Sequence, residues 1–148
     1  MKRFSFRLEQ VRKWRQDQAE MEEMRLEQLH TGLRGIEEQQ REIVASTDRS
    51  RRAVLAQSAV TAEELRSIEA LHEYAKQEMR RLKAEEQEVK ERLEEQRRRV
   101  LEAHRRFQLL DGLRDKALAT WTTARDKEQE ELGAELFLSR LARKSGSK

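Results

Sequence analysis

The sequence contains no cysteine and no proline, and only five of its 148 residues are glycine. Without cysteine the chain has no disulfide framework, no thiol nucleophile and no thiolate metal site. Without proline, and with good helix formers such as leucine, glutamate and arginine abundant, almost nothing interrupts a helical backbone. We therefore expect long helices.

Apolar side chains are also scarce, since 36% of residues are hydrophobic and 5% aromatic against 41% charged. That supply is too small for an ordinary globular core. A disordered chain is the competing class, but disorder of this kind comes with strong net charge, and here the net charge is only +3. The basic residues at the start are not followed by an apolar run as long as that of a signal peptide. No stretch approaches the roughly 18 apolar residues of a membrane span. A soluble, cytoplasmic protein is expected.

Apolar residues in the second half recur at alternating steps of three and four. The positions on this spacing are Leu65, Ile68, His72, Ala75, Met79, Leu82, Glu86, Val89, Leu93, Gln96, Val100, Ala103, Phe107, Leu110, Arg114, Ala117, Trp121 and Ala124. All but four of them are apolar. A 3.5-residue repeat sustained this far predicts a coiled-coil seam on one helix, from about residue 62 to 140.

The first half has its own seam, within a helix expected from about residue 3 to 56. Its positions are Leu26, Leu29, Leu33, Ile36, Gln40, Ile43, Thr47, Ser50 and Val54. Nearer the N-terminus the apolar residues follow another phase, at Phe4, Leu8, Val11, Trp14, Met21 and Met24. The mismatch predicts a stutter or stammer near residues 15 to 25.

A helix-start signature separates the two halves. Thr61 can cap a helix, Glu64 three residues later completes a capping box, and Val60 can pack on Leu65. This places a turn at about residues 57 to 61, and a short connection makes consecutive helices antiparallel neighbours. The expected fold is therefore all-α: a single coiled-coil domain built as an antiparallel hairpin, with a disordered basic tail at 144–148.

The two predicted helices differ in length, at about 80 Å and about 118 Å. The second must therefore overhang from Lys116 to about Arg140, where it still carries apolar residues such as Leu138. An apolar stripe without an intramolecular partner predicts a docking surface. The alternatives are that this stripe closes a homodimer or frays in solution. Basic residues gather at both chain termini, which the hairpin brings to the same end.

No constellation for catalysis is visible. His30, His72 and His104 match no metal-ligand spacing, and His72 is expected to be a register-setting polar residue in the seam. There is no glycine-rich phosphate loop, and a two-stranded rod has no concave site. We expect a non-enzyme without cofactor or metal. Nucleic-acid binding is not expected, because acids interleave with the bases, and membrane-surface binding by Lys2 to Arg15 is a minor alternative.

The opening Phe4-Ser5-Phe6-Arg7-Leu8-Glu9-Gln10-Val11 resembles that of the FliJ family, small coiled-coil proteins of the bacterial flagellar type III export apparatus. The stretch from Leu109 to Lys116, then Trp121, Glu128 to Leu132 and a basic C-terminus, resembles that family's C-terminal pattern. The likeness covers the full length in layout. It implies a role in flagellum biogenesis, and hence in motility and chemotaxis.

The resemblance further implies a stalk, similar to the central γ stalk of F-type ATPases, whose terminal end enters the hexameric ring of the flagellar export ATPase. The residues expected at that contact are Phe4, Arg7, Leu8, Val11, Trp14, Trp121, Leu132 and Leu136. The family also contacts the cytoplasmic region of the export-gate membrane protein nearer the turn. Laid on this chain, that contact falls on Gln39, Ile43, Leu71 and Ala75, for which simple burial in the seam is an equal alternative.

Such a protein would lie in the cytoplasm, peripheral to the inner face of the membrane through its partners, and would couple ATP hydrolysis to protein transport. Escort of export chaperones is a further role implied by the resemblance. The equivalent stalk of a virulence type III secretion system and a generic dimeric or nucleic-acid-associated coiled-coil scaffold are the alternative functions.

Overall fold

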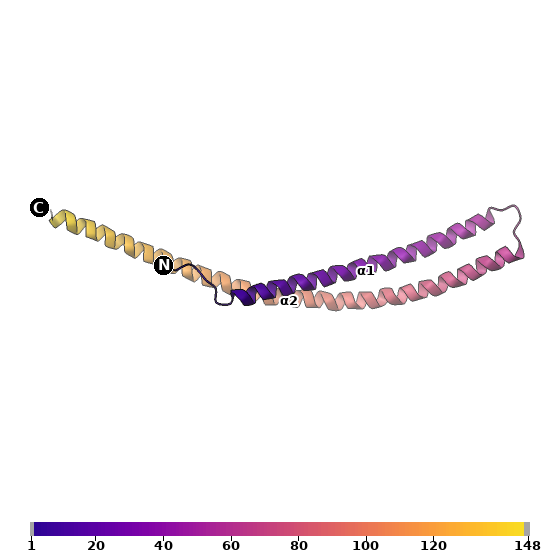
Figure 1. Ribbon diagram of the computed structural model, residues 1–148, viewed down its shortest axis with the longest axis horizontal. Helices are drawn as coiled ribbons and strands as arrows, with labels where there is room; N and C mark the ends of the chain where they lie inside the picture. Colours follow the sequence, from indigo (N-terminus) through magenta and orange to yellow (C-terminus); the bar gives the residue numbers. More distant parts are fainter. Residues whose placement is uncertain (1, 147–148) are drawn as a thin grey trace. The chain divides into compact units, whose positions relative to one another are not determined.

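The structure, a computed structural model, describes residues 2–146 and contains two long helices, drawn in Figure 1. Helix α1 spans Glu9–Leu55 and helix α2 spans Ala62–Gly146, with lengths of 47 and 85 residues. No strand occurs within the described range. The all-α class, the hairpin and the longer second helix are therefore confirmed.

The helix ends differ from the predicted ones at both termini. Helix α1 begins at Glu9 and not near residue 3. Residues 2–8 are non-helical, and the carbonyl of Lys2 accepts a hydrogen bond from the indole of Trp121. Helix α2 continues through residues 144–146, so the prediction of a disordered tail is wrong there, while 147–148 lie outside the described residues. No glycine or proline stands between Arg140 and Ser145 to stop the helix.

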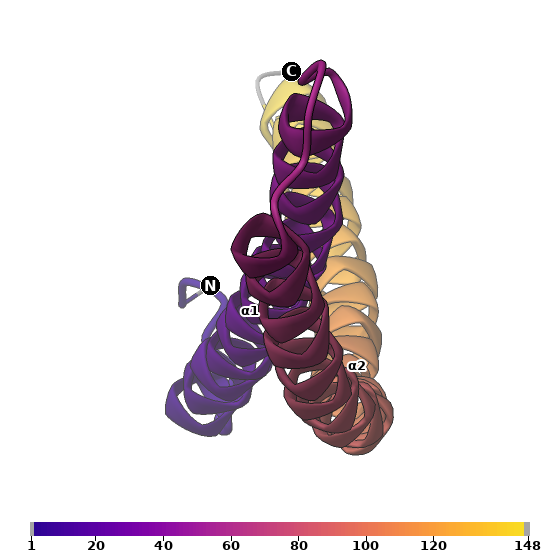
Figure 2. The same cartoon turned by 90° about the vertical axis from the view of Figure 1, so that its right-hand side faces the viewer.

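The connection between the helices ends in the predicted helix cap at Thr61. Residues 56–61 link the two helices, and in Figure 2 this segment is nearest the viewer. The hydroxyl of Thr61 accepts a hydrogen bond from the backbone N–H of Glu64 at 3.2 Å, and the Thr61 carbonyl accepts the N–H of Leu65 at 3.2 Å. Thr61 therefore caps α2 as its position predicted.

Contacts divide the chain into two units. The turn unit is Glu20–Leu101, and the terminal unit combines the described residues up to Ala19 with those from Glu102 onward. Both helices contribute to each unit, so each is a pair of antiparallel helical segments in its own right.

The core is thin in both units. The buried apolar residues of the described chain are Ala19 in the terminal unit and Leu82 and Leu93 in the turn unit, with Leu82 only 1% exposed. Most other seam residues are half-buried, as expected where each side chain meets only one partner helix. The predicted seam of α2 holds from Ile68 onward with few exceptions.

The polar positions of the α2 seam face polar partners on α1. Gln96, buried to 6% exposure, donates from Nε2 to the carbonyl and the carboxylate of Glu22. Glu86 accepts a hydrogen bond of 2.7 Å from Gln40, and Arg114 forms an ion pair of 3.4 Å with Glu9. Matched polar layers of this kind fix the register of a coiled coil, because a slipped alignment would leave polar groups against apolar ones.

His72 is an exception among those polar positions. It is exposed while the neighbouring Leu71 is half-buried, so the prediction of a core histidine is wrong. Ser50 and Leu65 are likewise exposed although both were assigned to the seam. All three lie on the part of the turn unit next to the connection, where the two ribbons separate in Figure 1.

The predicted stutter in the first helix is also wrong. The inward positions of α1 continue the three–four spacing of its later seam, through Arg12, Arg15, Ala19, Glu22 and Leu26. The apolar residues that suggested a second phase are exposed instead, namely Val11, Trp14, Met21 and Met24. The seam keeps its phase but is polar near its start, where the charged end of Arg12 is paired with Asp111 and Glu9.

Candidate docking surfaces

Residues 2–8 form a non-helical N-terminal arm that packs on α2 within the terminal unit. The ring of Phe4 meets that of Trp121 with centroids 5.9 Å apart and a tilt of 57°. The Trp121 indole Nε1 donates to the carbonyl oxygen of Lys2 at 3.2 Å, and the guanidinium of Arg125 lies 5.0 Å from the Trp121 ring centroid. The arm thus covers an aromatic residue that the sequence had placed on a bare overhang.

A charged cluster follows the arm where α1 begins. Arg12 donates from Nε to the Asp111 carboxylate at 3.0 Å and pairs with Glu9 at 3.1 Å. The hydrogen bond to Asp111 raises the pKa of the Arg12 guanidinium, an effect that desolvation opposes and the charge of Glu9 reinforces. Arg12 also lies over Phe107 at 5.4 Å. These contacts attach the first turns of α1 to α2 mainly through charge.

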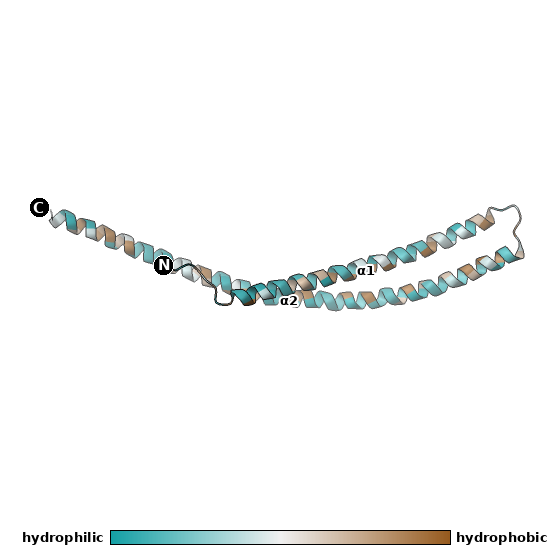
Figure 3. Cartoon of the chain, viewed as in Figure 1, coloured by the Kyte–Doolittle hydropathy of each residue, from teal (hydrophilic) through white to brown (hydrophobic). Residues whose placement is uncertain are grey.

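The final part of α2 is exposed along its whole length. Every residue from Asp126 to Gly146, here called the C-terminal segment, is exposed. Figure 3 shows apolar residues in brown among these last turns. The large apolar side chains there are between 48% and 63% exposed: Leu132, Leu136, Phe137, Leu138 and Leu141. An exposed apolar stretch is therefore present as predicted, although it begins about ten residues later than the predicted Lys116.

The structure brings together three of the eight residues predicted at the ATPase contact. Phe4, Trp121 and Leu132 border one depression, with a volume of about 430 Å³. The others stand apart from it: Arg7, Leu8, Val11 and Trp14 are exposed on the arm and α1, and Leu136 is exposed on α2. Arg15 lies 4.7 Å over the Trp14 ring.

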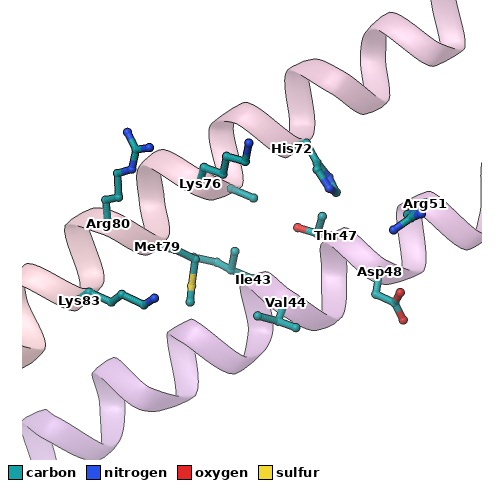
Figure 4. A pocket seen from close by; sticks show the side chains of 11 residues that line it. Ile43, Val44, Thr47, Asp48, Arg51, His72, Lys76, Met79, Arg80 and Lys83 are labelled. Carbon is teal, nitrogen blue, oxygen red and sulfur yellow. The ribbon is translucent and has the colours of Figure 1, made fainter.

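A groove opens between α1 and α2 in the turn unit. This turn groove has a volume of about 500 Å³ and is shown in Figure 4. Ile43 and Met79 point toward one another across it, and His72 points toward Thr47. Val44, at 58% exposure, extends the apolar floor along α1.

The rim of the turn groove is mostly basic. Four basic residues line it against a single acid, Asp48: Arg51, Lys76, Arg80 and Lys83. An apolar floor with a cationic rim is suited to a partner segment that has apolar residues and carboxylates.

Two of the four residues predicted at the export-gate contact line this groove. Ile43 and Ala75 are half-buried on facing helices and both border the groove. Gln39 is exposed and Leu71 is half-buried, and neither borders the groove.

Sequence reasoning missed several residues of both surfaces. Val44 and Met79 stand next to predicted residues, and the cationic rim follows α2 at three- and four-residue steps. Arg125 was identifiable only as the residue four positions after Trp121, which is the spacing at which two side chains meet on a helix.

The described residues form neither a metal site nor a membrane-spanning helix. Within the described residues no group of three or more histidine, cysteine, aspartate or glutamate side chains is arranged to hold a metal ion. Neither helix, over the same range, has a stretch long and apolar enough to cross a bilayer. No family model, no curated protein and no solved structure matches the chain.

Proposed function

We propose that this chain is a non-enzymatic stalk of the flagellar type III protein export apparatus. Its terminal unit binds the hexameric export ATPase, and its turn unit binds the cytoplasmic region of the export gate. By holding both partners it couples ATP hydrolysis to export, and it lies peripheral to the inner face of the membrane through them.

The observation that carries this proposal is the exposed apolar surface at the end of α2. A helix of 85 residues faces one of 47, and the longer helix exposes five large apolar side chains between Leu132 and Leu141. Exposed apolar surface of this extent favours a docking role. The opening from Phe4 to Val11 resembles that of FliJ proteins, and from this resemblance we infer that the docking partner is the flagellar export ATPase.

The turn groove supports the second contact. It joins Ile43 and Ala75, which the resemblance assigns to the gate, to an apolar floor with a basic rim. A gate segment bound here is expected to present apolar side chains flanked by carboxylates. The charges of the groove favour a protein partner of that composition.

The ATPase contact is tested by ending the chain after Arg125 and measuring binding to the purified export ATPase hexamer. This truncation keeps the Phe4–Trp121 and Arg12–Asp111 contacts, so circular dichroism should still report a helical hairpin. We expect binding to be lost. A truncated chain that binds as tightly as the full chain would contradict the proposal.

A finer test replaces Leu132 and Leu136 together by serine. We expect at least about tenfold weaker ATPase binding, because two apolar contacts are removed. Leu109→Ser is the matched control, since Leu109 is 70% exposed in the same unit and outside the proposed contact.

The gate contact is tested with Val44→Asp, which places a charge on the groove floor. Leu55→Asp is the matched control, because Val44 and Leu55 are 58% and 59% exposed on the same helix and Leu55 does not line the groove. Only Val44→Asp should weaken binding to the gate region, and ATPase binding should be unchanged in both variants.

The alternative function, a stalk of a virulence type III secretion system, predicts tighter binding to the ATPase of that system than to the flagellar export ATPase.

A further inference from the structure

The C-terminal segment carries a second apolar face, distinct from the one that holds Leu132 and Leu136. Ala134, Phe137, Leu138 and Leu141 follow the i, i+3, i+4, i+7 spacing, so they share one side of the helix. At about 100° per residue, this side lies roughly opposite Leu132 and Leu136. All four residues are exposed. The apolar residues assigned to the ATPase contact therefore lie on a different face.

Charge along the same segment is divided into two halves of opposite sign. The first half, residues 126–135, contains five acids and a single base, Lys127. The second half, residues 136–146, contains bases and no acid: Arg140, Arg143 and Lys144. A segment that is acidic at one end and basic at the other is complementary to a reversed copy of itself.

The apolar face and the charges favour the same alignment of two copies of the C-terminal segment. In an antiparallel pair centred near Phe137, Glu130 of each copy lies opposite Lys144 of the other. The two residues are about four helical turns apart, and so flank the apolar face on the same side. Phe137, Leu141 and Lys144 border a common surface depression, consistent with a shared side. A parallel pair would instead place Glu130 against Glu130 and Lys144 against Lys144.

We propose that this face is the contact of a homodimer, in which the C-terminal segments of two copies pair antiparallel about a twofold axis near Phe137. The occupant is a second copy of this chain, because the charges complement a reversed copy of the same segment. A contact built on one helix from each subunit is smaller than the roughly 1,600 Å² of a standard interface, so association should be reversible and depend on concentration. This dimer does not rest on the proposed function.

The experiment is sedimentation equilibrium of the full chain and of two charge-reversal variants, Glu130→Lys and Lys144→Glu. The full chain should show a reversible monomer–dimer equilibrium. Each variant alone should dimerise about tenfold more weakly, because the twofold axis repeats the like-charge pair. An equimolar mixture of the two variants should associate about as well as the unaltered chain, since both cross-copy pairs are then of opposite sign.

Glu128→Lys is the matched control, because it makes the same charge change on a side of the helix away from the apolar face. It should leave the equilibrium nearly unchanged. The proposal is overturned if the full chain stays monomeric at all concentrations, if Glu128→Lys weakens association as much as Glu130→Lys, or if the mixture fails to restore it.

The absence of cysteine allows an independent test of direction. Under oxidation, a mixture of Glu130→Cys and Lys144→Cys chains should form a disulfide-linked dimer more efficiently than either variant alone. Efficient self-linking of Lys144→Cys alone would indicate a parallel pair and overturn the antiparallel assignment.

Discussion

The turn unit and the terminal unit use the same two helices but are held together by different chemistry. In the turn unit, Leu82 and Leu93 are buried in the seam and a glutamine–glutamate pair sets each polar layer. In the terminal unit, Arg12 takes the equivalent place and bonds Asp111, while the apolar residues near it lie outside. A continuous helical seam can therefore change from apolar to ionic along its length without changing phase.

The largest expected effect comes from emptying the core of the turn unit. Leu82→Ala should lower the free energy of unfolding by about 2–4 kcal/mol, because it removes a fully buried side chain and leaves a cavity. Urea unfolding followed by circular dichroism measures this. Leu101→Ala, on the same helix but at a residue that is 61% exposed, should stay within about 0.5 kcal/mol of the unaltered chain. Equal losses in the two variants would remove the distinction between core and surface in this unit.

The next effect concerns the polar layer at Gln96. Gln96→Ala should cost about 1–2 kcal/mol, because Glu22 loses its partner inside the seam. The matched control is Gln87→Ala at an exposed position of the same helix, expected to change stability by less than about 0.5 kcal/mol. If Gln96→Ala proved neutral, the layer would not contribute to the stability of the turn unit.

In the terminal unit, the next expected effect comes from removing the contact between Phe4 of the arm and Trp121 of α2. Phe4→Ala should cost about 1 kcal/mol and release the arm from Trp121. In a Trp14→Phe background, the fluorescence of Trp121 should shift to longer wavelength as its ring becomes hydrated. Arg7→Ala changes an exposed residue of the same arm and should leave the emission unchanged.

The smallest effect is a dependence on acid in the turn unit. Hydrogen bonds from Lys90 and then Gln40 lower the pKa of the Glu86 carboxyl. Since folding lowers this pKa, the ionised carboxylate stabilises the fold above its unfolded-state pKa. That contribution disappears as the pH falls through the folded-state pKa, which lies below the ordinary range of a glutamate carboxyl. Urea midpoints measured from neutral to acidic pH should fall less steeply for Glu86→Gln than for the unaltered chain.

The sequence was sufficient for the hairpin, its turn and most of its seam. The three–four spacing is visible because nearly every seam position of α2 is apolar, and the cap at Thr61 is a local pattern. The start of α1 was not predictable in the same way, since Arg12 and Arg15 at inward positions look like surface residues in a sequence. Arg12 takes its inward position beside Asp111 and Phe107 of α2, which are far away in the chain.

The candidate surfaces were predicted less well than the fold. The overhang was expected from helix lengths alone, but the arm covers Trp121 and so shortens it. The turn groove depends on the separation of the helices, which leaves His72 and Ser50 exposed although their spacing fits the seam. Spacing along one helix carries no information about how far away its partner lies.

The exposed connection between the helices is a suitable site for attaching a label. Every residue from 56 to 61 is exposed, and the first hydrogen bond of α2 closes on Thr61. Loops of this kind tolerate inserted residues well. A dye or tether attached before Thr61 would leave both chain termini unaltered. A single molecule could then be immobilised through this connection while its terminal residues stay free to bind other proteins.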